Sequence, residues 1–163
     1  MRRWSSPETI PNIGINDSYT YACQQRCKEF FFDNQGNDFE MNILLVFAGG
    51  GIGAVARYWM QGIVYRFVNG MFPYGTVAVN VLGCFVIGLL VTGMEDRFMV
   101  NPSLRIFMTI GILGGFTTFS SFSFETIALL QEGEVLFGML NILASIVICL
   151  SATYIGVIIG KLF

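Results

Sequence analysis

The chain has 163 residues, of which 54% are hydrophobic and 12% are charged, and its formal net charge is −2. A soluble domain carries about 25% charged residues, so this composition indicates a membrane protein. The absence of histidine excludes histidine metal sites and histidine general bases. Residues 41–163 hold as many basic as acidic side chains, so we expect no nucleic-acid partner.

Residues 1–40 differ from the rest because they are polar and rich in turn-forming residues. No apolar run of a secretory signal peptide follows Arg2 and Arg3. Cys23 and Cys27 lack the second ligand pair of a zinc site, and we assign them no role. Met41 begins an apolar run typical of the start of a membrane protein. We therefore predict that residues 1–40 are an extension that is disordered or not natively translated.

Residues 41–163 contain four apolar segments, each long enough to cross a bilayer core. We predict membrane helices over about residues 43–67, 74–94, 104–130 and 135–162. Four crossings place both termini on one side of the membrane. The expected fold is therefore an all-α membrane protein with one four-helix transmembrane domain.

Residues 114–125 interrupt the third apolar segment with the sequence GGFTTFSSFSFE. Glycine lowers helix propensity, and serine and threonine hydroxyls compete for backbone hydrogen bonds. Irregular backbone at membrane depth is tolerated only inside protein or along a cavity. We predict a break in the third helix that has a polar function. The alternative is close helix packing through small residues.

Several side chains in these segments require polar surroundings. Asn80 either bonds a neighbouring helix or lines a pore. Arg57 should face a protein interior, a vestibule or the headgroups, unless it simply snorkels. Phe119 and Phe122 share one face if the helix resumes after the break. Glu125 is expected near an aqueous mouth.

The uncharged polar side chains at membrane depth indicate what could pass between the helices. Hydrogen-bond donors and phenyl ring edges favour a small, hard anion, because ring edges carry positive quadrupole charge. Carbonyl groups freed at a helix break favour a hard cation such as Na⁺ instead. This chemistry indicates a passive conduit or transporter and does not name the ion. The uncharged polar groups are Asn80, Thr117, Thr118, Ser120, Ser121, Asn141 and Ser145.

Three motifs in chain order resemble those of the Fluc/CrcB fluoride channel family. They are residues 49–58 (GGGIGAVARY), 74–85 (YGTVAVNVLGCF) and 111–125 (GILGGFTTFSSFSFE). The resemblance covers essentially all of residues 41–163. It implies a fluoride-selective channel, not an enzyme, that exports fluoride passively across the inner membrane of the cell. It also implies an antiparallel, dual-topology homodimer of four-helix subunits with two pores.

The resemblance further implies roles for individual residues. The residues of the fluoride pore would be Asn80, Phe119, Phe122, Ser120, Ser121 and Ser145. Backbone carbonyls of Gly114 and Thr117 would hold a structural Na⁺ at the dimer interface. Arg57 would lie near a vestibule and Glu125 near a pore end. Asn141 stands where some members have a tyrosine, and its role stays open.

Two other functions compete with the channel. A small multidrug exporter requires a membrane-embedded glutamate, for which Glu125 is the single candidate. A structural or regulatory membrane protein would conduct no ion at all. An intramembrane enzyme is disfavoured, because the sequence offers no acid–base pair and no metal cluster.

Overall fold

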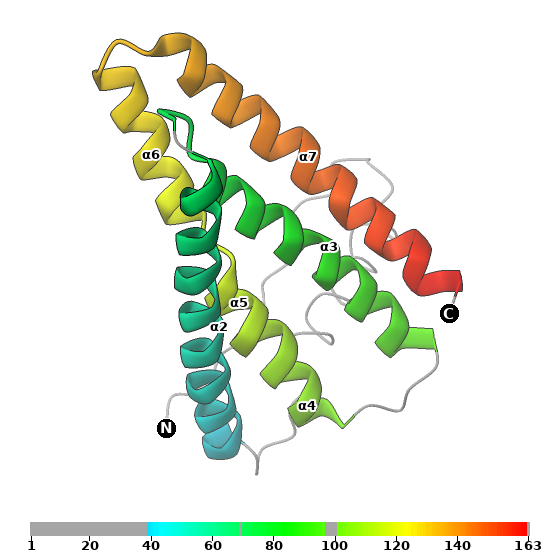
Figure 1. Cartoon of the computed structure of the whole chain (residues 1–163). Coiled ribbons are helices and arrows are strands. Elements are labelled where there is room, and N and C mark those ends of the chain that lie inside the picture. Colours follow the sequence, from blue (N-terminus) through cyan, green and yellow to red (C-terminus); the bar gives the residue numbers. More distant parts are fainter. Residues whose placement is uncertain (1–38, 69, 97–100, 163) are drawn as a thin grey trace, which may run out of the picture. The chain divides into compact units, whose positions relative to one another are not determined.

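The computed structural model describes residues 39–68, 70–96 and 101–162, and these residues form helices and short connections without a strand. Predictions on residues 1–38, including those on Cys23 and Cys27, lie outside the described residues. The helices, shown in Figure 1, are α2 (Phe39–Phe67), α3 (Tyr74–Asp96), α4 (Pro102–Ile106), the π-helix η1 (Phe107–Leu113), α5 (Gly114–Phe116), α6 (Phe119–Gln131) and α7 (Val135–Leu162).

Four segments of the described chain are long and apolar enough to cross a membrane, which confirms the four predicted membrane helices. They are Phe39–Phe67, Tyr74–Gly93, Pro102–Gln131 and Val135–Leu162. α2 begins before residue 43 and takes in Phe39 and Glu40, which we had placed in the extension. A carboxylate in the first helical turn is favourable because it faces the positive end of the helix dipole.

The third segment starts at Pro102, earlier than predicted, because Asn101 caps it. The Asn101 side-chain oxygen accepts a hydrogen bond from the Ser103 amide at 2.9 Å. Proline at the first helical position costs nothing here, since its missing N–H would have no partner inside the helix.

Glycines let α2 approach η1 and α5 at backbone distance. A Cβ built on Gly49 would lie 2.8 Å from the Phe107 carbonyl oxygen, and one on Gly53 would overlap the Ile112 carbonyl. Such close contact maximises dispersion between helices that gain little from hydrophobic burial in lipid. The segment carrying the break is therefore held against a rigid neighbour.

We expect Gly53→Ala to destabilise the fold by about 1–3 kcal/mol, because the backbone of Ile112 cannot move aside as a flexible side chain would. The matched control is Gly51→Ala in the same helix, where an added Cβ has no atom within 4 Å. The thermal midpoint of each purified variant in detergent measures its stability. Equal midpoints for the two variants would contradict the close packing at Gly53.

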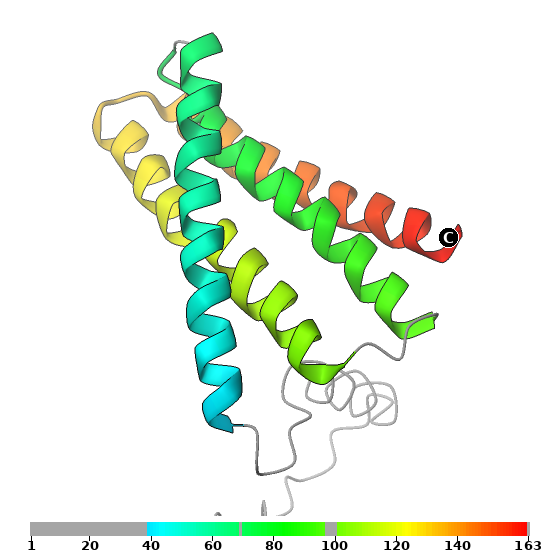
Figure 2. The same cartoon turned by 60° about the horizontal axis from the view of Figure 1, so that its bottom comes forward.

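The helices α3 and α7 run side by side in the same direction (Figures 1 and 2). A Cβ on Gly88 would overlap the Thr153 carbonyl, and a Cβ on Gly156 would overlap the Phe85 carbonyl. Further along, a Cβ on Gly160 would lie 3.0 Å from the Leu89 carbonyl oxygen. These contacts fix the register of α3 against α7 over several turns.

Candidate functional site

The third membrane segment is interrupted at Thr117 and Thr118, as the sequence predicted. Both residues are extended, with φ and ψ of −76° and 155° at Thr117 and −150° and 111° at Thr118. The π-helix η1 and the single turn α5 precede them, and α6 resumes at Phe119. The interruption lies near the middle of Pro102–Gln131. π-helical turns are frequent at functional sites.

Asn80 of α3 satisfies the backbone that the interruption exposes. Its Nδ2 donates to the Thr118 carbonyl at 3.0 Å, and its Oδ1 accepts from the Thr118 amide at 2.8 Å. The Asn80 oxygen thus takes the place of the Gly114 carbonyl, which would accept from this amide in an unbroken helix. The Asn80 amide adds a bond to a carbonyl that, as the N-cap of α6, also starts the new helix. An amide has two N–H donors, and the bond to Thr118 uses one of them.

Thr118 organises the start of α6 and is almost fully buried. Its Oγ1 accepts from the Ser121 amide at 3.1 Å, which is a side-chain cap of the new helix. The same hydroxyl lies 3.0 Å from the Ser121 hydroxyl and 3.2 Å from that of Ser120. Hydrogen bonds therefore bring Asn80, Ser120 and Ser121 together through Thr118. The sequence analysis counted Thr118 among the polar groups without giving it this role.

Phe119 and Phe122 form a ring pair on the first turn of α6. Their centroids are 5.3 Å apart and their planes are tilted by 49°. The expected shared face is therefore present. Phe119 is 79% exposed in the single chain, so the pair presents ring surface outward rather than filling the subunit core.

The carbonyl groups around the interruption are not all used by the chain. The Thr118 amide bonds Asn80, so it is not available to the Gly114 carbonyl four residues earlier. The Thr117 carbonyl accepts from Arg57 Nη1 at 3.5 Å, which is the outer limit of a hydrogen bond. Gly114 is exposed in the single chain. Arg57 thus points its charge at the interruption.

Glu125 belongs to a hydrogen-bonded chain that joins three helices. Gln61 of α2 donates to the Thr76 hydroxyl of α3 at 3.1 Å, and that hydroxyl donates to Glu125 Oε1 at 2.7 Å. The second carboxylate oxygen is buried and has no hydrogen-bond partner within the described part of the chain. Glu125 does not end the segment, because α6 continues to Gln131. The sequence analysis did not identify Gln61 or Thr76, because their pairing depends on tertiary structure.

We expect Thr76→Val to lower stability by about 1–3 kcal/mol, because Gln61 and Glu125 each lose a partner while the shape is kept. Thr153→Val is the control, since the Thr153 hydroxyl bonds only the Cys149 carbonyl of its own helix. The thermal midpoint of Thr76→Val should lie below that of Thr153→Val. A midpoint for Thr76→Val as high as that of the control would mean that the chain of bonds contributes nothing.

Asn141 and Ser145 lie one turn apart on α7. Asn141 is completely buried and donates to the Thr126 hydroxyl at 2.8 Å. The Asn141 Oδ1 and the Ser145 hydroxyl are both buried, and neither has a hydrogen-bond partner in residues 39–68, 70–96 or 101–162. Among the described residues, Ser145 is therefore not joined by hydrogen bonds to Asn80 and the hydroxyls of the interruption.

Comparison with known proteins decides the family. The pattern of the family described as CrcB-like protein, Camphor Resistance (CrcB) matches residues 44–157. The chain belongs to the CrcB family. Relatives named fluoride-specific ion channel FluC include one from Geotalea uraniireducens, 45% identical over 73% of this chain and 96% of its own length. Another from Magnetococcus marinus is 45% identical over 75% of this chain and 99% of its own length.

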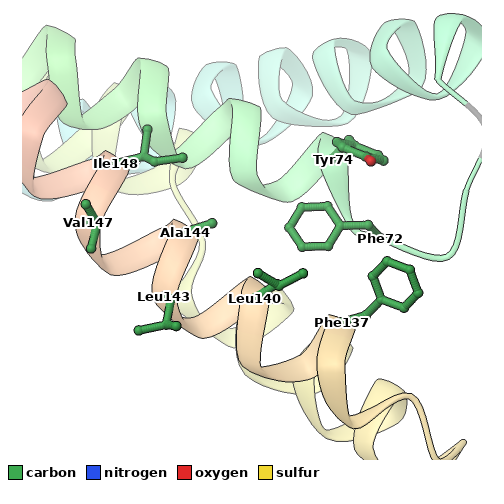
Figure 3. A pocket seen from close by; sticks show the side chains of 8 residues that line it. All are labelled: Phe72, Tyr74, Phe137, Leu140, Leu143, Ala144, Val147 and Ile148. Carbon is green, nitrogen blue, oxygen red and sulfur yellow. The ribbon is translucent and has the colours of Figure 1, made fainter.

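A groove of about 480 Å³ lies between the start of α3 and α7 in this CrcB family member. Figure 3 shows that side chains from the connection before α3 and from α7 face it. None of the predicted pore residues lines it, and its walls are apolar, which suits an apolar occupant and no ion. The lining residues are Phe72, Tyr74, Phe137, Leu140, Leu143, Ala144, Val147 and Ile148.

Proposed function

We propose that this CrcB family member is a fluoride-selective channel that lets fluoride leave the cell passively across the inner membrane. The observation that carries the proposal is the interruption at Thr117 and Thr118, where Asn80 and serine hydroxyls gather beside an exposed phenylalanine pair. The family match and the names of its relatives support the same function.

The chemistry of these groups suits fluoride, which holds its hydration water strongly. An anion that sheds water needs donors in its place, and uncharged donors supply them without binding it too tightly to leave. The remaining N–H of Asn80 and the hydroxyls of Ser120, Ser121 and Ser145 are such donors. The ring edges of Phe119 and Phe122 add positive quadrupole charge, and a narrow path beside them would reject larger halides by size.

The proposed pore is incomplete in one chain, because Phe119 and Gly114 are exposed there. We propose that a second copy covers them in an antiparallel, dual-topology homodimer. The small number of basic residues at the ends of the membrane segments supports this. Arg105 and Lys161 lie at the ends on one side and Arg66 on the other, and insertion in both orientations requires such a weak bias.

The carbonyl groups of Gly114 and Thr117 fit a structural Na⁺ in that dimer. They are hard oxygen ligands, and the Gly114 carbonyl has lost its usual helical partner. Two oxygens from each subunit would supply four. The bound ion would neutralise carbonyl dipoles that the interruption leaves facing the partner. The contact of Arg57 with Thr117 O is long enough to leave that oxygen its second lone pair.

Arg57 and Glu125 have separate places in this proposal. Arg57, half-buried and directed at the interruption, would raise the local concentration of anions in a vestibule. Glu125, held by Thr76, would lie at one end of the pore.

The experiment is fluoride efflux from liposomes that contain the full chain, read with a fluoride electrode. Efflux of chloride from matched liposomes is the control for selectivity. Fast release of fluoride without chloride supports the channel. Folded protein that releases neither ion would favour a non-conducting membrane protein, and release that requires a proton gradient would favour an exporter driven by Glu125.

A further inference from the structure

Two cysteine thiols meet where α3 packs against α7. Cys84 of α3 and Cys149 of α7 are both partly buried and neither belongs to a disulfide, and the two thiols are close enough to interact. The packing of α3 against α7 explains why the two cysteines lie near each other. Gly88 lies against the Thr153 carbonyl, and Cys84 and Cys149 are each one turn earlier on these parallel helices. The close approach of the two backbones therefore brings Cys84 and Cys149 near each other.

The surroundings of the thiol pair limit what it can bind. Among the described residues, no group of three or more histidine, cysteine, aspartate or glutamate side chains could hold a metal. Zinc requires four such ligands in a structural site, so the pair cannot supply a zinc site. Two sulfur ligands alone suit a soft d¹⁰ ion that accepts linear coordination, because thiolates prefer soft metals.

The net charge of the metal–thiolate complex favours one class of these ions. Thiols bind metals as thiolates, so binding releases protons. Two thiols that lose two protons give a complex of charge −1 with a monovalent ion and a neutral complex with a divalent one. The segments that carry the pair are apolar, and an uncompensated charge there is costly. We propose that Cys84 and Cys149 form a two-thiolate site for a soft divalent cation of the mercury(II) type, which would fasten α3 to α7.

The test uses the full chain in detergent and nitrate buffer, with Cys23→Ser and Cys27→Ser as the background so that only the proposed pair remains. The probe is mercury(II) nitrate, followed by excess free cysteine as competitor. Native mass spectrometry counts the ions per chain, and the near-ultraviolet thiolate-to-mercury band reports the ligands. We expect one ion per chain, and two protons released for each ion bound.

The variants Cys84→Ser and Cys149→Ser, each added to this background, should lose the ion at about 100-fold lower competitor concentration. Two ligands on one scaffold hold an ion at high effective concentration, and one ligand does not. Cys84→Ala and Cys149→Ala repeat the comparison if a serine variant elutes as unfolded protein. This test is independent of the proposed fluoride channel, because none of its measurements uses fluoride.

Three results would overturn the proposal. The first is a background protein that keeps no ion against free cysteine. The second is a single variant that holds the ion as tightly as the background. The third is fewer than two titratable thiols per unfolded background chain before metal is added, since a disulfide would then occupy the pair.

Discussion

Replacing both Phe119 and Phe122 with isoleucine is expected to reduce fluoride efflux from liposomes by at least about 30-fold. Isoleucine keeps the apolar bulk and removes the positive ring edge that would face the anion. If each edge is worth about 1 kcal/mol, as in contacts between two rings, the pair contributes about 2 kcal/mol, and each 1.4 kcal/mol is a factor of ten. The fluoride electrode reads the initial rate of release.

Phe124→Ile is the matched control for this loss. Phe124 lies on the same helix, is 75% exposed and is not part of the ring pair. It should keep efflux within about twofold of the parent protein, a change of roughly 0.4 kcal/mol on the same scale. If all three phenylalanines proved interchangeable with isoleucine, the ring edges would have no role in conduction.

The sequence predicted the architecture well because membrane helices depend on local properties. Hydrophobic length set the four segments, and the run of glycines and hydroxyls at residues 114–125 indicated the break. The bounds were less accurate at Phe39 and Pro102, where capping and first-turn charges extend the helices. The length of an apolar run does not by itself predict effects of capping residues or of charges in the first turn.

The contacts of the site were harder to predict, because they depend on which residues meet across helices. Composition showed that Asn80 needs a partner but did not select between a neighbouring helix and a pore. The structure shows that both ends of its amide bond Thr118, which still leaves one N–H that could face a pore. The tie of Glu125 to Thr76 likewise joins residues 49 positions apart, a pairing that no local spacing indicates.

Asn80→Leu is expected to lower the stability of the fold and to abolish fluoride efflux. Leucine has a similar volume but leaves the Thr118 amide without a partner at the interruption, while the Thr118 carbonyl keeps its bond within α6. An unpaired buried amide costs about 1–3 kcal/mol, so the loss of stability should lie in that range. The thermal midpoint in detergent and the initial rate of fluoride release measure the two effects.

Asn42→Leu is the matched control, because it makes the same chemical change at a position where we expect no loss of stability. Asn42 is 8% exposed in α2, and its side-chain oxygen is buried without a partner. Removing a buried oxygen that has no partner among the described residues should leave the midpoint equal to or above that of the parent, since its desolvation penalty disappears with the group. If Asn80→Leu were as harmless as Asn42→Leu, the interruption would not depend on Asn80. Its two hydrogen bonds to Thr118 would then be a consequence of the fold rather than one of its causes.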